Sequence, residues 1–213
     1  MMQSNSGTNS RSLLRCGVAA GPFYLAVGLA QAFVRDGFDL ARHSLSVLAN
    51  GAGGWVQTAN LALSGLLVIA AATGLHSVLR PQSRAVGWIL SCFGLGMVVG
   101  AVFPADPVDG FPVGTPDGFP TTVSTPGLIH FAAGAFGFLA LAVSCFVVAM
   151  AMIRRRNLWM AGLSFISGVF IIAGFAAPAL LPASGPVAGI WFSVVVGWTW
   201  LALTCLFLDR AAP

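Results

Sequence analysis

The chain has 213 residues, of which 57% are hydrophobic and only 8% are charged. Soluble domains carry about a quarter charged residues, so this composition excludes a water-soluble globular protein and predicts one that spans a membrane. The ten basic residues are all Arg and the six acidic residues are all Asp. The Arg residues lie between apolar segments, where they act as topology determinants, so the net charge of +4 does not predict a nucleic-acid partner.

Six apolar segments approach or exceed the roughly 20 residues that cross a bilayer core about 30 Å thick. They run approximately over residues 14–34, 55–79, 85–103, 127–153, 158–180 and 187–208. In lipid, segments of this length satisfy their backbone polar groups as helices. The sequence therefore predicts an all-α fold, a polytopic bundle of six transmembrane helices over 13–210, preceded by a disordered cytoplasmic N-terminus at 1–12.

The Arg residues are divided unequally between the two sides of such a bundle. One side holds Arg11, Arg15, Arg80, Arg84, Arg154, Arg155, Arg156 and Arg210. The other side holds only Arg35 and Arg42. Because basic residues favour the cytoplasmic side, we expect both termini in the cytoplasm and a multi-pass protein of the bacterial inner membrane.

The first apolar segment has a second interpretation. Basic residues, an apolar run and Ala30-Gln31-Ala32 are also typical of a signal peptide with its cleavage site. The segment is long enough to span, however, and it carries a small or polar stripe at helical spacing: Gly21, Tyr24, Gly28 and Gln31. Such stripes suit helix packing in lipid, so we expect a retained helix.

The first loop on the side with few Arg residues, at about 35–54, predicts a short amphipathic helix. Asp39 is a good N-cap and Gly51 a good C-terminal stop. Helical spacing puts His43, Ser46 and Asn50 on one face and the leucines on the other. We expect this helix to lie at the membrane interface, with Arg42 beside its polar face. The alternative is an interfacial linker in which Arg42 contacts lipid phosphate.

The second loop on that side, at about 104–126, holds six of the twelve prolines. It cannot be helical throughout, and proline limits its freedom, which predicts a tethered cap over the bundle. The tetrapeptide Asp-Gly-Phe-Pro occurs twice in it, at 109–112 and 117–120. Asp106 lies between two prolines immediately after the third segment, and this position fixes where its carboxylate points.

Polar side chains near the loop side of the bundle are costly in lipid and therefore informative. Gln57 and Ser64 are expected to form hydrogen bonds between helices. Asn60, Asp106 and His130 are expected at about the same depth, near the membrane boundary on the loop side. The first loop brings Arg42 and His43 to that depth. The sequence therefore predicts one pocket that opens outward beneath the proline-rich loop, lined by Arg42, His43, Asn60, Asp106 and His130. Helices are expected to meet through Gly96, Gly100, Gly134, Gly137, Ser193 and Gly197.

These residues also carry a resemblance to a known family. The features are Arg42-His43-Ser44-Leu45-Ser46, Gly54-Trp55-Val56-Gln57 with Asn60, Phe103-Pro104-Ala105-Asp106-Pro107, Gly110-Phe111-Pro112, and Gly127 with His130. The chain thereby resembles the bacterial membrane family numbered nine hundred and ninety-eight among domains of unknown function. The resemblance implies a six-helix bundle and supplies no established activity. The second Asp-Gly-Phe-Pro copy departs from the family pattern.

Two classes of function fit these residues. The first is an enzyme acting on a lipid or isoprenoid substrate at the extracytoplasmic interface, by head-group hydrolysis or transfer or by acid-initiated cyclisation. In it, Asp106, His43 and His130 would be the catalytic acids and bases. Arg42, Ser46, Trp55 and Asn60 would bind the substrate, and Ser44 or Ser46 would be the nucleophile. The alternative is a non-enzymatic lipid or small-molecule binding, sensing or carrier protein.

No motif predicts a cofactor or a metal site. The chain has no Gly-rich phosphate loop after a strand, and no pair of histidines at matched depth that would hold haem. His43, His130 and Asp106 lack any metal-ligand spacing. The four cysteines lie inside apolar segments and are interpreted as packing residues. The expected partners are therefore the membrane bilayer and a membrane lipid or hydrophobic small molecule.

Overall fold

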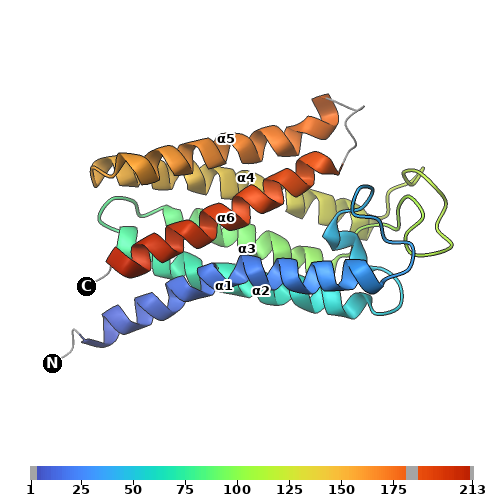
Figure 1. The fold of residues 1–213 in the computed structure, drawn as a ribbon, viewed down its shortest axis with the longest axis horizontal. Coiled ribbons are helices and arrows are strands. Elements are labelled where there is room, and N and C mark those ends of the chain that lie inside the picture. Colours follow the sequence, from blue (N-terminus) through green and yellow to red (C-terminus); the bar gives the residue numbers. More distant parts are fainter. Residues whose placement is uncertain (1–3, 181–186, 212–213) are drawn as a thin grey trace.

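The helices of the protein run along one common axis (Figure 1). The structure, a computed structural model, describes residues 4–180 and 187–211. These residues form the α-helices α1 (Ser4–Val34), α2 (Gly54–Leu79), α3 (Val86–Val102), α4 (Thr125–Arg154), α5 (Leu158–Leu180) and α6 (Ala188–Ala211), with a short 3₁₀ helix, η1 (Leu45–Ala49). No β-strand occurs among the described residues, and the predicted all-α fold is confirmed.

Helices that follow one another in the chain also lie against one another, and α6 returns to α1. The six helices therefore form a closed ring around a shared interior. The N- and C-terminal ends of the chain lie at one end of this bundle, the terminal end (Figure 1). Residues 35–53 and 103–124 lie together at the other end, the loop end, and we refer to these two loops as the cap.

Helices α1, α2, α4, α5 and α6 are long and apolar enough to cross a membrane. Helix α3 is apolar but has only 17 residues, which at 1.5 Å per residue is about 26 Å. Large apolar side chains are exposed along the outer surface of the bundle, among them Phe136, Phe165 and Ile172. Such a surface is stable only in contact with lipid, so the chain is a multi-pass membrane protein.

Small residues allow the helices to approach closely, as expected. A Cβ at Gly96 would lie 3.3 Å from the Cα of Gly137, where α3 meets α4. The Ser193 hydroxyl donates to the Ile171 carbonyl, 3.0 Å away, and joins α6 to α5. Gly197 packs against a leucine of α4. The predicted helix contact at Gly134 is wrong, because a Cβ there would meet no atom within 4 Å.

Two local predictions differ from the structure. Residues 4–12, predicted to be disordered, belong to α1, and they contain no proline that would end a helix continuing from the apolar segment. In the first loop, only Leu45–Ala49 is helical rather than the whole of 39–51. There the Asp39 carboxylate accepts the backbone N–H of Ala41 at 2.8 Å, which favours a turn over a helix N-cap.

The short helix η1 is inserted into the loop end of the bundle and does not lie flat at its edge. Leu45 and Leu48 are buried against α1 and α2. Gly28 makes room for this insertion, since a Cβ at that position would collide with the Leu45 side chain. The first loop therefore closes the interior of the ring at the loop end through η1.

Candidate functional site

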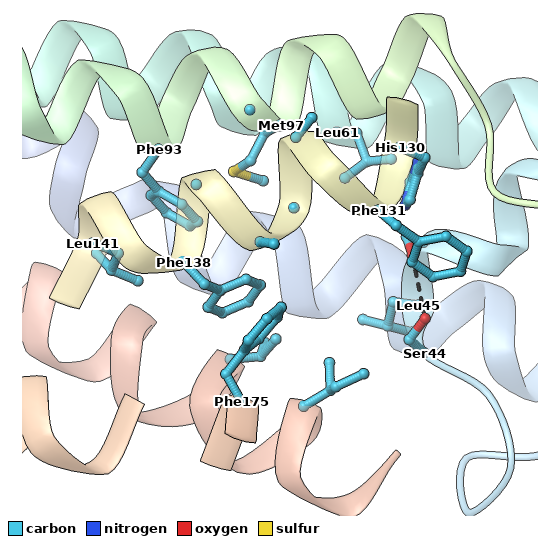
Figure 2. A pocket seen from close by; sticks show the side chains of 18 of the residues that line it. Ser44, Leu45, Leu61, Phe93, Met97, His130, Phe131, Phe138, Leu141 and Phe175 are labelled. Carbon is cyan, nitrogen blue, oxygen red and sulfur yellow. Dashed lines mark hydrogen bonds between the residues drawn. The ribbon is translucent and has the colours of Figure 1, made fainter. Parts of the chain in front are cut away.

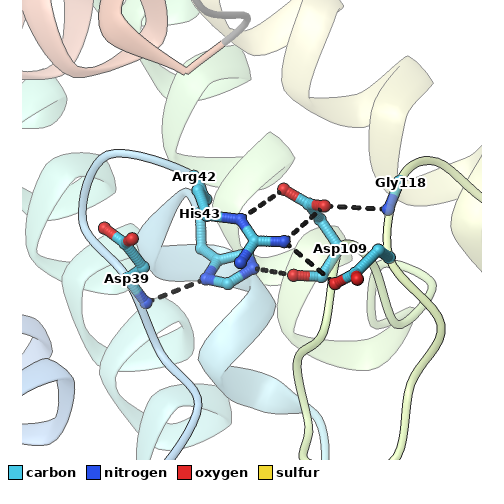
Figure 3. Close-up of polar contacts among 6 residues, drawn as sticks. Asp39, Arg42, His43, Asp109 and Gly118 are labelled. Carbon is cyan, nitrogen blue, oxygen red and sulfur yellow. Dashed lines mark hydrogen bonds and ion pairs between the residues drawn. The ribbon is translucent and has the colours of Figure 1, made fainter.

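Arg42 joins the two loops of the cap (Figure 3). Its Nε and Nη2 atoms donate to the two carboxylate oxygens of Asp109 at 2.8 Å and 2.6 Å, and Nη2 also donates to Asp117 at 3.2 Å. The Arg42 hydrogen bonds, followed by one from the Gly118 N–H, hold the pKa of Asp109 well below its usual value. Two of the three guanidinium nitrogens of Arg42, Nε and Nη2, are therefore engaged within the cap.

His43 is a second bridge between the two loops (Figure 3). Its Nδ1 accepts the backbone N–H of Asp39 at 3.0 Å, which leaves the ring proton on Nε2. Nε2 lies 3.0 Å from the carbonyl oxygen of Asp109 and donates to it. The ring also packs against Phe38 and Phe111. Both nitrogens of this buried histidine are used to hold the cap together.

Asp106 organises the start of α4. Its Oδ2 accepts the backbone N–H of Ser124 at 3.0 Å, and the Ser124 side chain accepts the N–H of Gly127 at 3.1 Å as the N-cap of α4. A Cβ at Gly127 would collide with the Asp106 carboxylate, so only glycine permits this approach. The negative charge also lies beside the positive end of the α4 dipole.

Asn60 belongs to a buried polar network between α1 and α2. Its amide nitrogen donates to the Tyr24 carbonyl at 3.0 Å and to Gln57 at 3.1 Å. The Gln31 amide donates to Gln57 at 2.9 Å, so the predicted interhelical bond of Gln57 is confirmed. Ser64 instead donates to Asn60 within α2. This network joins helices, and Asn60 does not line the cavity described next.

A cavity of about 170 Å³ occupies the centre of the ring in its loop-end half. Its wall is mainly aromatic and aliphatic (Figure 2), with Phe93, Phe138, Phe175, Trp191 and Trp198 contributing from α3, α4, α5 and α6. Ser44, Leu45 and Ser46 close it toward the cap. On α4, the lining residues Phe131 and Ala135 are exposed, so the cavity opens onto the lipid-facing surface.

Three polar groups at the cavity wall retain hydrogen-bonding capacity. Nδ1 of His130 lies 2.9 Å and 3.2 Å from the carbonyls of Phe103 and Gly100, so Nδ1 carries the proton and Nε2 is left as an acceptor. Among the described residues, neither this Nε2 nor the Tyr24 hydroxyl has a hydrogen-bond partner, although both side chains are more than nine-tenths buried. The hydroxyls of Ser44 and Ser46 pair with each other at 3.2 Å.

The structure does not bring the predicted site residues into one pocket. Of the seven, only Ser46 and His130 line the cavity. Trp55 is 74% exposed on the outer surface of α2. The remaining polar residues are separated because each is bonded to its own neighbours: Arg42 and His43 in the cap, Asp106 at α4, and Asn60 between α1 and α2. Within residues 4–180 and 187–211, no group of three His, Cys, Asp or Glu residues could hold a metal ion.

A family model described as a protein of unknown function, DUF998, matches residues 18–209. The chain belongs to the DUF998 family. No curated protein and no solved structure matches it. The matched range of this DUF998 protein includes both the cap and the whole cavity lining, from Tyr24 to Trp198. The resemblance inferred from the sequence is therefore confirmed.

Sequence reasoning missed most of the cavity of this DUF998 protein. The signal lies in α4, where His130, Gly134, Phe138 and Leu141 recur at helical spacing and line the cavity. Gly134 is at the centre of this face and leaves space in front of it. A glycine flanked by an aromatic residue and a histidine on one face of a membrane helix favours a ligand pocket as well as helix packing.

Proposed function

We propose that this DUF998 protein binds a single lipid or isoprenoid chain in the cavity, with the cap on the extracytoplasmic side of the bacterial inner membrane. One observation carries the proposal: the cavity is apolar and aromatic, yet the Nε2 of His130 and the hydroxyl of Tyr24, two largely buried residues of its wall, have no hydrogen-bond partner among the described residues. Leaving a buried polar group unpaired is costly. A ligand that supplies the missing hydrogen bonds removes that cost.

The side of entry and the orientation have independent support. The cavity opens at Phe131 and Ala135 on the outer surface of α4, so a chain enters from the bilayer without crossing water. Eight of the ten Arg residues belong to the terminal end, and the two at the loop end have partners in the cap. Basic residues favour the cytoplasmic side, so the cavity belongs to the outer leaflet.

The test is photolabelling in lipid nanodiscs with a hydrocarbon chain that carries a diazirine. We expect inward-facing Phe138 and Leu141 to be labelled, besides Phe136, which faces lipid on the same helix. Gly134→Leu fills the open space in the cavity and should abolish inward labelling while leaving Phe136 labelled. Gly162→Leu on α5 is the matched control, because a Cβ there also meets no atom within 4 Å but does not face the cavity.

Two results would contradict ligand binding in the cavity. One is the absence of label on Phe138 and Leu141 in the native protein. The other is inward labelling that is the same in Gly134→Leu and Gly162→Leu. Equal melting temperatures of the two variants would establish that loss of labelling is due to the filled cavity and not to misfolding.

A second candidate function is the enzyme acting on a lipid or isoprenoid substrate that the sequence predicts. It is favoured by one observation: a free His130 Nε2 and the hydroxyls of Ser44 and Ser46 at the same end of the cavity (Figure 2). A serine would attack an ester carbonyl as Nε2 takes its proton, and the proton would then pass to the leaving alcohol. Labelling of either serine by a fluorophosphonate, lost in His130→Asn, would support this function; unlabelled serines would oppose it.

A further inference from the structure

We propose that the ligand of the cavity is an uncharged single-chain alcohol, bound with its hydroxyl group at the cap end. This inference rests on the proposed function and adds the chemical class of the ligand. It follows from the charges, the hydrogen-bonding groups and the shape of the cavity.

The absence of charged lining residues selects against a charged head group. None of the described residues that line the cavity is Arg or Asp. Arg42, the predicted anion ligand, is bonded to Asp109 and Asp117 within the cap. Asp106 is bonded at the start of α4. A phosphate, carboxylate or ammonium group in the cavity would therefore lose its hydration without gaining an opposite charge, which is far more costly than burying a neutral group.

The polar groups at the cap end match a hydroxyl. His130 Nε2 can only accept a hydrogen bond while Nδ1 donates to the α3 carbonyls. In the Ser44–Ser46 pair one hydroxyl donates to the other, and the second keeps its own hydrogen available. This end thus offers an acceptor at Nε2 and a donor at the serine pair, whose oxygens can also accept. An alcohol supplies both a donor and an acceptor, whereas an ether or an ester has no hydrogen for Nε2.

The shape of the cavity favours one chain. His130, Phe131 and Ser44 lie at one end, and Phe93, Phe138 and Leu141 lie toward the other (Figure 2). The volume of about 170 Å³ is close to that of an apolar cavity of about 150 Å³ that accommodates a benzene ring. The cavity therefore admits one hydrocarbon chain, and the part of that chain that does not fit extends into the lipid. A second chain has no room beside the first.

The experiment uses a long-chain alcohol carrying a diazirine, bound to the full-length protein in nanodiscs. Unlabelled competitors of the same chain length are added: the alcohol, its methyl ether, the carboxylate and the trimethylammonium compound. An isoprenoid alcohol and a straight-chain alcohol are compared in parallel, and diacylglycerol tests for a two-chain ligand. Label on Phe138 is measured by mass spectrometry, with label on lipid-facing Phe136 as the internal reference.

We expect the alcohol to compete about tenfold more strongly than the methyl ether, the size of effect given by one hydrogen bond in a water-poor site. His130→Asn keeps a donor for the α3 carbonyls but removes the acceptor at the Nε2 position. In this variant the alcohol should compete for labelling of Phe138 only as strongly as the methyl ether does. Gly162→Leu, which adds a side chain on α5 outside the cavity, should leave the preference unchanged.

The inference is overturned if the carboxylate or the ammonium compound competes as strongly as the alcohol. It is equally overturned if diacylglycerol competes best, or if the alcohol preference survives in His130→Asn. In each of these cases Phe138 is still labelled, so chain binding stands and only the ligand class fails. If Phe138 is not labelled by any probe, the proposed function fails together with the inference.

Discussion

The cap and the cavity use polar residues in opposite ways. In the cap, ionisable side chains are numerous and well paired: Arg42 makes three hydrogen bonds to carboxylates, and both nitrogens of His43 are bonded. In the cavity, polar groups are few, and the Nε2 of His130 and the hydroxyl of Tyr24, both on largely buried residues, have no partner among the described residues. The cap meets its own hydrogen-bonding demand, whereas the cavity does not.

This difference teaches that a cluster of ionisable residues is not by itself a binding site. The paired residues of the cap already bond to one another, so few of their donors and acceptors are available to a ligand. Candidate function is assigned instead to polar groups that line a cavity and have no hydrogen-bond partner, because a ligand in the cavity can supply the missing bond. If the comparison is correct, changes at the paired residues of the cap, such as Arg42 and Asp106, should act through stability, and changes at residues that line the cavity should act through binding.

The largest effect is expected from the first copy of the repeated tetrapeptide. Phe111 is 1% exposed and packs edge-on against Phe38, with the Arg35 guanidinium 5.2 Å from its ring centre. Phe111→Ala should destabilise the protein by about 3–5 kcal/mol, as for other buried phenylalanines. Thermal unfolding in detergent measures this loss.

The second copy of the tetrapeptide provides the control. Phe119 follows the same Asp-Gly pair but is 73% exposed. Phe119→Ala should change stability by less than about 0.5 kcal/mol, as for other surface substitutions. Equal losses in the two variants would mean that the cap is not organised around Phe111, and the contrast between the two copies would be wrong.

The two copies also illustrate what the sequence can predict. The all-α fold and the grouping of the loops followed from apolar segment length, because lipid leaves the backbone few alternatives. The sequence could not show which copy of the tetrapeptide is buried and which is exposed, because both copies have the same residues. The difference arises from long-range partners: Arg42 and Phe38 reach the first copy only after α1, α2 and α3 have packed.

The candidate site was less predictable for the same reason. The sequence placed Asp106, His43 and His130 at a similar depth near the loop side of the membrane. Their hydrogen-bond partners are backbone groups, and the sequence does not show which backbone groups a side chain will reach. The cavity depends on an absence of packing in front of Gly134. Such a gap is visible only when the neighbouring helices are in place.

A smaller effect on stability is expected at Asp106. Asp106→Ala removes the acceptor for the backbone N–H of Ser124, the N-cap residue of α4, and loss of one hydrogen bond costs about 1 kcal/mol. Asp106→Asn keeps an acceptor and should recover most of this loss. Diazirine labelling of Phe138 should be the same in both variants as in the native protein.

The Asp106 experiment can break the comparison between the cap and the cavity. Asp106→Asn could keep the native melting temperature and still lose the labelling of Phe138, or lose any turnover. That result would show that this carboxylate has a functional role. Asp106 would then belong with His130 as a predicted catalytic residue, and the assignment of the cap to stability alone would be wrong.

The smallest effect is a pH dependence of the cap. The Arg42 hydrogen bonds and then the Gly118 N–H depress the pKa of Asp109 in the folded protein. A depressed pKa stabilises the fold above the unfolded value of about 3.9, and this stabilisation is lost as pH falls through the lower, folded value. The cap should therefore stay closed at neutral and mildly acidic pH and open only in stronger acid. Proteolysis of residues 104–124, by a neutral protease and by pepsin in acid, measures the opening.

Arg42→Gln and Asp117→Asn distinguish the contribution of Arg42 to cap closure from that of Asp117. Arg42→Gln removes the main cause of the pKa shift, so cleavage of 104–124 should increase already at neutral pH. Asp117 contributes one bond of 3.2 Å from a well-exposed carboxylate, and Asp117→Asn should behave like the native protein. Cleavage that is the same in Arg42→Gln and in the native protein would contradict this account, because the Arg42 bonds to Asp109 would then not hold the two loops together.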